Sequence, residues 1–252
     1  MNFKMSLPIR LLLIFVSLIL LSFHGISQTR YFYSLFPGIS VSAPVSEKLE
    51  VNLSSYIQYN TFGRQYDGIY FPAAFNYFDF QTGGVYKYNQ HIHYAVAWYF
   101  RVSEPGRSSA FSENRFWQQV SIISRIDHLR FRNRLRIEQR LISRNGQAEP
   151  LRWRLRYQAG LEIPLQGEKT DVREFYVSVL NEAYFSLNKP RPAIFSENWI
   201  SALVGYRISK KSRLEFGPVW QMQIRNGDNE KNNYFHFQAN LLIQTSVFRK
   251  NI

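Results

Sequence analysis

Cysteine is absent from this 252-residue chain, only five histidines occur, and long apolar runs are confined to the first 27 residues. Without cysteine, an exported protein has no disulfides to hold it together. Beyond Gln28 a polar residue interrupts every apolar stretch within a few positions. This pattern excludes a protein that crosses a membrane with helices.

Acidic residues are also scarce, because 18 Asp and Glu stand against 31 Lys and Arg, for a formal net charge of +13. Such a balance could indicate a nucleic-acid partner. The arginines, however, alternate along strand-like segments instead of clustering, and the N-terminus indicates export. We therefore expect no nucleic-acid partner. The charge predicts an anionic partner such as lipopolysaccharide outside the protein, or Arg–Glu networks inside it.

The N-terminus has the pattern of a signal peptide. Lys4 and Arg10 precede the apolar run of residues 11–21, and the small residues Gly25 and Ser27 follow it. We predict a signal peptide over residues 1–27, cleaved before Gln28. The alternative is a membrane anchor, but the run is short for a span of about 20 residues. Residues 28–252 then form one domain.

Period-two alternation dominates the rest of the chain. Over residues 129–141 the odd positions are largely apolar, whereas the even positions carry five arginines and Glu138. Residues 151–163 repeat the pattern with Arg152, Arg154 and Arg156. A strand places these two sets on opposite faces, and a helix would mix them. Each segment is longer than an ordinary strand and has the length of a tilted membrane strand with its ends.

The same alternation, in places weaker, predicts eleven strands. They cover residues 31–43, 48–60, 74–88, 91–102, 113–125, 129–141, 151–163, 175–187, 197–208, 212–225 and 234–247. Short connections alternate with long ones, as in bacterial barrels, although residues 164–174 are longer than this rule expects. Bacterial barrels usually have an even number of strands. We therefore expect Arg30–Phe36 to form a separate short strand that turns at Pro37-Gly38, with both termini in the periplasm.

The predicted fold is all-β: an antiparallel up-and-down transmembrane β-barrel of about 12 strands, with 10 as the alternative. An aromatic content of 17% fits the aromatic girdles of membrane barrels. A soluble β-sandwich or a lipocalin-like barrel would also alternate. Strand length, aromatic content, the lack of cysteine and the arginine-dense face favour the membrane barrel.

Several short motifs resemble a known family. They are residues 133–140 (Asn-Arg-Leu-Arg-Ile-Glu-Gln-Arg), residues 154–157 (Arg-Leu-Arg-Tyr), Asn181-Glu182 and Glu197-Asn198. The chain resembles the outer-membrane proteins grouped as domain of unknown function 2490, found in Bacteroidota and other Gram-negative bacteria. The resemblance implies an outer-membrane barrel and no established activity. Trp199 stands where the family pattern leads us to expect arginine.

The charged strand face predicts a network inside the barrel. Adjacent strands would place two rows of arginine side by side, and like charges directly opposite each other are destabilising. Glu138, Glu182 and Glu197 are the expected counter-charges, since an arginine fork binds a carboxylate with two hydrogen bonds. The predicted lumen network comprises Arg134, Arg136, Glu138, Arg140, Arg152, Arg154, Arg156, Glu182 and Glu197. It could plug a narrow lumen or form an anion-selective constriction.

Candidate catalytic and metal-binding residues are few. His91 and His93 share a strand face, but no third ligand is identifiable, so we predict no metal and no cofactor. His236 lies on one face with Gln238 and Asn240, which raises the possibility of a lipid hydrolase. Such an enzyme needs a serine paired with the histidine. The sequence indicates no such pair, so we predict no catalytic residues.

These patterns predict a porin-like protein of the cell outer membrane with an Arg/Glu-lined lumen, acting as a structural barrel or narrow channel and not as an enzyme. The alternative is a membrane-embedded hydrolase acting on lipid or lipopolysaccharide. The expected partners are outer-membrane lipid, lipopolysaccharide and the barrel-assembly machinery.

Overall fold

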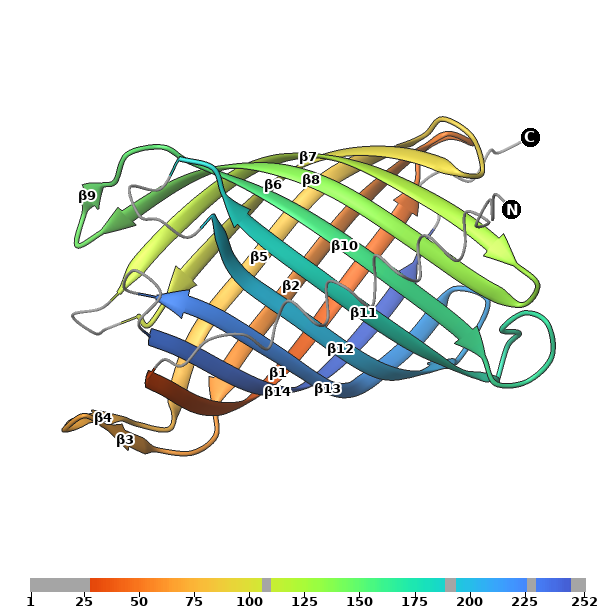
Figure 1. Cartoon of the computed structure of the whole chain (residues 1–252). Helices are drawn as coiled ribbons and strands as arrows, with labels where there is room; N and C mark the ends of the chain where they lie inside the picture. Colours follow the sequence, from red (N-terminus) through yellow and green to blue (C-terminus); the bar gives the residue numbers. More distant parts are fainter. Residues whose placement is uncertain (1–27, 106–109, 189–193, 226–229, 246–252) are drawn as a thin grey trace, which may run out of the picture.

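The computed structural model describes residues 28–105, 110–188, 194–225 and 230–245. The predicted signal peptide, residues 1–27, lies outside the described residues. The strands close into a barrel (Figure 1). In the part of the chain that the structure describes, no helix has the length and apolar character needed to cross a membrane.

Eleven long strands form the barrel wall. They are β1 (Gln28–Pro44), β2 (Leu49–Asn60), β5 (Ala74–Lys87), β6 (Ile92–Ser103), β7 (Phe111–Ile126), β8 (Leu129–Arg144), β10 (Arg152–Pro164), β11 (Phe175–Ser186), β12 (Phe195–Arg207), β13 (Ser212–Arg225) and β14 (Glu230–Gln244). Three short strands lie between them: β3 (Arg64–Tyr66), β4 (Ile69–Phe71) and β9 (Gln147–Ala148). The strand positions predicted from alternation are confirmed to within a few residues.

The sheet has twelve strands, in agreement with the predicted count, but its twelfth member is β9, which pairs only with β8. The wall itself has eleven strands and forms one closed ring. Antiparallel pairing joins β8 to β10, and parallel pairing joins β1 to β14 over Gln28–Ser42. A closed up-and-down wall with an odd number of strands must contain one such parallel pair, which we call the parallel seam.

The predicted turn at Pro37-Gly38 is wrong. Residues Gln28–Pro44 form one strand, and the two residues lie within it. Gly38 provides room for the ring of Tyr56, because a Cβ atom at this position would collide with that ring. Gly38 therefore allows a side chain of β2 to approach the backbone of β1 closely. The pairing of β1 with β2 is interrupted at Pro37, which has no backbone N–H to donate.

The barrel has two different ends. We call the "turn end" the one that holds the connections 45–48, 88–91, 127–128, 165–174 and 208–211, and the "loop end" the opposite one, where β3, β4 and β9 lie (Figure 1). Gln28 pairs with Glu230 at the loop end, and Gln244 lies at the turn end. β1 therefore starts at the loop end and β14 finishes at the turn end, because the two strands run in the same direction. This contradicts the expected separate strand before Gly38, which would have brought the start of the barrel to the same end as its finish.

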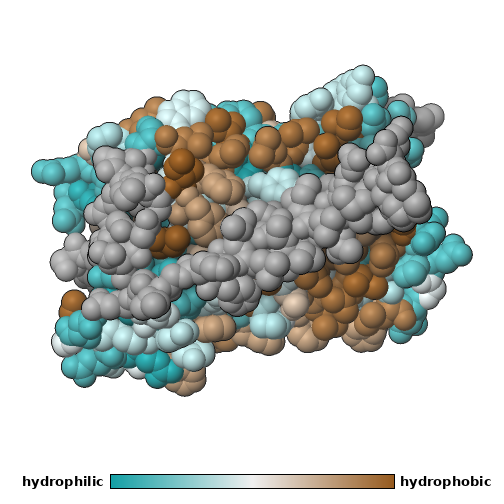
Figure 2. Space-filling view, in the orientation of Figure 1, coloured by the Kyte–Doolittle hydropathy of each residue, from teal (hydrophilic) through white to brown (hydrophobic). Residues whose placement is uncertain are grey.

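Alternation separates the two faces of the wall. Large apolar side chains point outward and are exposed, among them Leu35, Val51, Val96, Phe116, Ile122, Leu135 and Phe237. Among wall-strand side chains that the structure describes, Lys231, near the loop end, is the one charged group on the outward parity. In the view of Figure 2, hydrophobic surface lies along the wall and hydrophilic surface gathers toward the two ends.

Polar side chains on the outward face satisfy one another across neighbouring strands. Gln118 and Gln139 exchange two hydrogen bonds, and the hydroxyl of Tyr157 donates to Asn133. Further cross-strand pairs are Trp98 with Asn114, Asn181 with Asn198 and Trp220 with Asn233. These contacts reduce the cost of placing amides on an apolar surface.

Candidate functional site

The barrel encloses a cavity of about 1480 Å³ whose lining reaches both ends. Arg144 and Asn188 line it at the loop end, and Lys87 and Lys211 line it at the turn end. Eighteen Lys and Arg side chains and ten Asp and Glu side chains belong to the described lining. The positive surplus of the chain is therefore concentrated on the inner wall.

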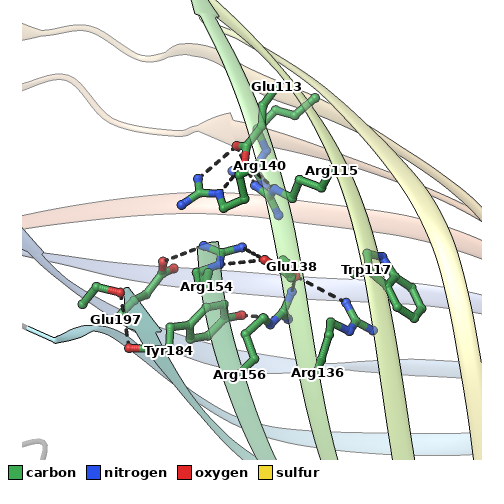
Figure 3. A network of polar contacts seen from close by, with 12 residues as sticks. Glu113, Arg115, Trp117, Arg136, Glu138, Arg140, Arg154, Arg156, Tyr184 and Glu197 are labelled. Carbon is green, nitrogen blue, oxygen red and sulfur yellow. Dashed lines mark hydrogen bonds and ion pairs between the residues drawn. The ribbon is translucent and has the colours of Figure 1, made fainter. Parts of the chain in front are cut away.

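Three buried carboxylates, Glu113, Glu138 and Glu182, organise the middle of this wall, and each binds at least two arginines. Figure 3 shows Glu113 and Glu138 with their partners. Glu138 lies 2.5 Å from Arg154 and 2.7 Å from Arg156. Glu182 contacts Arg134 at 2.5 Å and Arg156 at 2.7 Å. Because the distances are those of charge-assisted hydrogen bonds, these groups form one connected network on β8, β10 and β11.

Glu113 on β7 is the third of these carboxylates, and it lies 2.6 Å from Arg115 and 2.5 Å from Arg140. Its side chain is 1% exposed, and that of Glu138 is fully buried. At such depth an unpaired carboxylate would be costly, and two arginines compensate each one.

Strand register explains why the carboxylates are needed. Arg136 lies directly opposite Arg156, and Arg140 lies directly opposite both Arg115 and Arg152. Such like-charged neighbours repel each other. Glu138, one step along β8 on the same face, binds Arg156 diagonally, and Glu113 binds Arg140 in the same way. The two arginine rows thus coexist because acidic residues alternate with them.

Aromatic rings support the guanidinium groups from the side. Arg136 lies 3.8 Å from the ring centroid of Trp117 and donates two hydrogen bonds to Gln119. Arg156 donates to the Tyr184 hydroxyl and lies 4.5 Å from its ring centroid. Stacking of this kind suits the planar guanidinium and holds it in place.

All nine residues of the predicted network line the cavity, and the structure brings eight of them together near the middle. Arg152 instead lies toward the loop end, where it binds Glu149 at 2.5 Å. Glu197 is 3.8 Å from Arg154 and accepts hydrogen bonds from Trp199 and Gln221. The residue that replaces the expected arginine, Trp199, therefore still points into the lumen.

Sequence reasoning missed Glu113 and its partner Arg115, as well as the pair Asp79–Arg101 at 2.6 Å. The alternation did place Arg115 on the inner face. The sequence pattern could also have identified Glu113, because it lies two residues from Arg115 and so on the same inner face. Its strand, however, carries few charged residues on that face, so the alternation of charge is less evident than on residues 129–141.

A chain of polar contacts runs around the inner wall and crosses the parallel seam. It connects Asn76, Gln58, Ser34, His236, Gln221, Glu197, Arg154 and Glu138, each on a different strand. At the seam, Ser34 Oγ lies 2.5 Å from His236 Nδ1. This serine–histidine pair contradicts the expectation that none exists, and parallel pairing of β1 with β14 creates it.

The contacts also assign the proton positions of this pair. Gln221 donates its amide N–H to Glu197, so its carbonyl oxygen faces His236 Nε2 at 2.8 Å and accepts a hydrogen bond from it. With the proton on Nε2, Nδ1 is free to accept the hydroxyl proton of Ser34. Ser34 is 4% exposed and His236 is 2% exposed, and neither lines the cavity.

A metal site is not evident. Within the described ranges no group of three or more potential ligands gathers. His91 bonds to the backbone carbonyl of Ile123, and His93 lines the cavity near the turn end.

Comparison with known protein families identifies the family of this chain. Residues 34–232 match the family described as "Protein of unknown function (DUF2490)". No curated protein matches the chain, and no solved structure matches it.

Proposed function

The chain belongs to the family of unknown function DUF2490, and we propose that it is an outer-membrane barrel whose Arg/Glu-lined lumen forms a narrow, anion-preferring passage. Its partners in this proposal are outer-membrane lipid, lipopolysaccharide and the barrel-assembly machinery. A signal peptide over residues 1–27 would direct the chain out of the cytoplasm.

The outward face supports the membrane location. Charged side chains on the wall strands point inward, with Lys231 near the loop end as the described exception, and the outward amides are paired across strands. A protein in water has no need to exclude charge from its outer wall, whereas charge facing lipid costs about 2–4 kcal/mol at the bilayer midplane.

The inner face supports the preference for anions, and its charge is the observation that carries the proposal. Eighteen cationic and ten anionic side chains line a cavity that reaches both ends of the barrel. A confined lumen with one prevailing sign of charge concentrates ions of the opposite sign. The buried Arg–Glu network narrows this path and stabilises it. A purely structural plug would need no charge surplus.

The proposal predicts anion-selective conductance. Protein recovered from the outer-membrane fraction of cells and inserted into planar bilayers should give discrete conductance steps. Under a tenfold KCl gradient the reversal potential should have the sign expected when chloride is more permeant than potassium, because the cationic lining repels potassium. The absence of steps, a cation-selective reversal potential or a wholly soluble protein would contradict it.

A second candidate function, a membrane-embedded hydrolase, is favoured by the Ser34–His236 contact. In this function His236 Nδ1 takes the hydroxyl proton while Ser34 Oγ attacks an ester carbonyl of a lipid. The alkoxide leaving group then takes that proton, and water releases the acyl group from Ser34. Gln58, whose amide lies 3.2 Å from Ser34 Oγ, is placed to donate to the oxyanion. The burial of Ser34 requires that the adjacent wall open for substrate.

Covalent labelling tests the hydrolase. An active nucleophile predicts that a fluorophosphonate probe labels the folded protein and that Ser34→Ala abolishes the label. Ser40→Ala is the matched control, since Ser40 lies on the inward face of the same strand, hydrogen-bonds to Tyr56 and should leave labelling unchanged. An unlabelled wild-type protein, with an unchanged lipid profile in cells lacking the gene, would eliminate this candidate.

A further inference from the structure

The turn end of the cavity holds arginines that the protein leaves without sufficient counter-charge. We use the name "turn-end vestibule" for the cluster formed by Arg125, Arg130, Arg132, Arg207, Arg213 and Glu162, all of which line the cavity. The acidic residues that line this end besides Glu162 are Glu50, Glu168 and Asp171. The vestibule differs from the middle of the barrel, where acidic and basic groups alternate.

Register places like charges directly opposite each other here as well. Arg125 is paired with Arg130 across β7 and β8, and Arg207 is paired with Arg213 across β12 and β13. In the middle of the barrel, comparable pairs are separated by a buried carboxylate. Here one carboxylate, that of Glu162, serves two arginines, at 3.2 Å from Arg130 and 3.7 Å from Arg213.

Two nearby acidic groups, Glu50 and Glu215, are committed elsewhere. Glu50 binds Lys87 at 2.7 Å. Glu215, also at this end, accepts a hydrogen bond from the Tyr176 hydroxyl at 2.6 Å. Arg207 satisfies one of its donors on the backbone carbonyl of Thr170. Glu168 and Asp171 line this end but form no ion pair with the vestibule arginines within the described residues. Across the described ranges, ion pairs therefore compensate Arg130 and Arg213 and leave Arg125, Arg132 and Arg207 without one.

Arg132 is the centre of the vestibule. Its direct cross-strand neighbours are Gly160 and Ile123, so neither adjacent strand places a polar side chain directly opposite it. Arg134, Arg130 and Arg213 repel its charge, and Glu162 attracts it. Its side chain is exposed to the cavity. On β10 the space over Gly160 is filled by the side chain of Leu180, an apolar group that offers the guanidinium no hydrogen bond.

We propose that the turn-end vestibule is a binding site for a phosphate group, with Arg132, Arg130 and Arg213 as its ligands. A phosphate offers several oxygens to these guanidinium forks and carries the charge that the register leaves missing. The phosphate is either free in solution or part of a lipid headgroup that reaches the turn end. The physiological role of this site rests on the proposed anion passage, because phosphate would bind at one end of that passage.

Titration calorimetry on the detergent-purified mature protein tests this site, with inorganic phosphate as one probe and phosphatidic acid in mixed micelles as the other. Saturable binding of at least one probe is expected, weakened tenfold or more by Arg132→Gln. Arg144→Gln removes the same charge at the loop end, where Arg144 binds Glu149, and should leave affinity unchanged. Arg213→Gln provides a second variant, and a heat-modifiable gel mobility verifies folding of each.

The two probes identify the source of the phosphate. Binding of inorganic phosphate supports a free solute, and binding of phosphatidic acid alone supports a headgroup. No saturable binding of either probe, or an equal loss in Arg144→Gln, would overturn the site. Conductance measured on the same preparations separates the two proposals. Phosphate binding without conductance would support the binding site and contradict the proposed passage. Conductance without phosphate binding would support the passage and contradict the site.

Discussion

Glu138→Gln is expected to destabilise the folded barrel by about 3–5 kcal/mol, because it breaks a buried ion-pair network and leaves Arg154 and Arg156 without their shared carboxylate. Glutamine keeps the shape of the side chain but is neutral, and it has one acceptor oxygen where the carboxylate has two. The measurement is the free energy of unfolding in urea for protein refolded into phospholipid vesicles, with wild type and variant compared at one lipid composition.

The matched control for this change is Glu149→Gln. Glu149 also binds two arginines, Arg144 and Arg152, but at the exposed loop end, where side chains of these partners are 49% and 33% exposed. Water screens such pairs, so the loss should stay below about 1 kcal/mol. The double variant Glu138→Gln/Arg154→Met should recover part of the stability, since it removes one unpaired guanidinium. Equal losses at Glu138 and Glu149 would refute the role of the central network.

Leu135→Arg is expected to cost about 2–4 kcal/mol in a bilayer, because it places a charge on the outward face near the middle of β8. Leu135 is 45% exposed and lies between Arg134 and Arg136, which both point inward. Arg134→Leu should cost less, because Arg156 still binds Glu182 in its absence. The measurement is again the free energy of unfolding from phospholipid vesicles.

The control for Leu135→Arg is the same substitution at a different depth in the membrane. Leu129→Arg introduces the same charge on the same face of β8, but at the strand's first residue, beside the turn end. Arginine near a membrane interface costs about 0–1 kcal/mol. A soluble barrel has no reason to distinguish these two positions, so equal effects of Leu135→Arg and Leu129→Arg would contradict membrane insertion.

The two faces of the barrel have different energetic roles. Outside, apolar side chains and paired amides make the wall compatible with lipid. Inside, the carboxylates of Glu113, Glu138 and Glu182 each bind at least two arginines, so the network holds strands at fixed positions while its positive surplus remains facing the cavity. Around Arg132 the arginines outnumber the carboxylates that pair with them, and a bound anion would supply the missing negative charge.

Much of the fold was predictable from local pattern. Alternation over residues 129–141 and 151–163 correctly placed Leu135 outward and Arg134 inward, because a strand sends successive side chains to opposite faces whatever its partners are. The same rule located eleven wall strands and the inner position of the predicted charged residues. Glu138 and Glu182 were identified as partners of arginine because opposite charges on one face must meet.

Pairing across the barrel was beyond local pattern. Pro37-Gly38 has the composition of a turn, and only the packing of the Tyr56 ring against Gly38 explains its place within β1. The expectation of an even number of strands led to the prediction of a separate strand before Pro37-Gly38. The wall instead has an odd number of strands, because β1 and β14 pair in parallel. Ser34 and His236 are 202 residues apart and meet only because that seam is parallel.

The sequence by itself thus determined which residues form strands and which side of the wall each one faces, since that property depends on neighbours in the chain. The tertiary structure decided which residues meet, namely Glu113 with Arg140, Ser34 with His236 and Glu162 with two arginines. These contacts depend on strand order, register and the direction of closure, which are properties of the whole ring and not of any single strand.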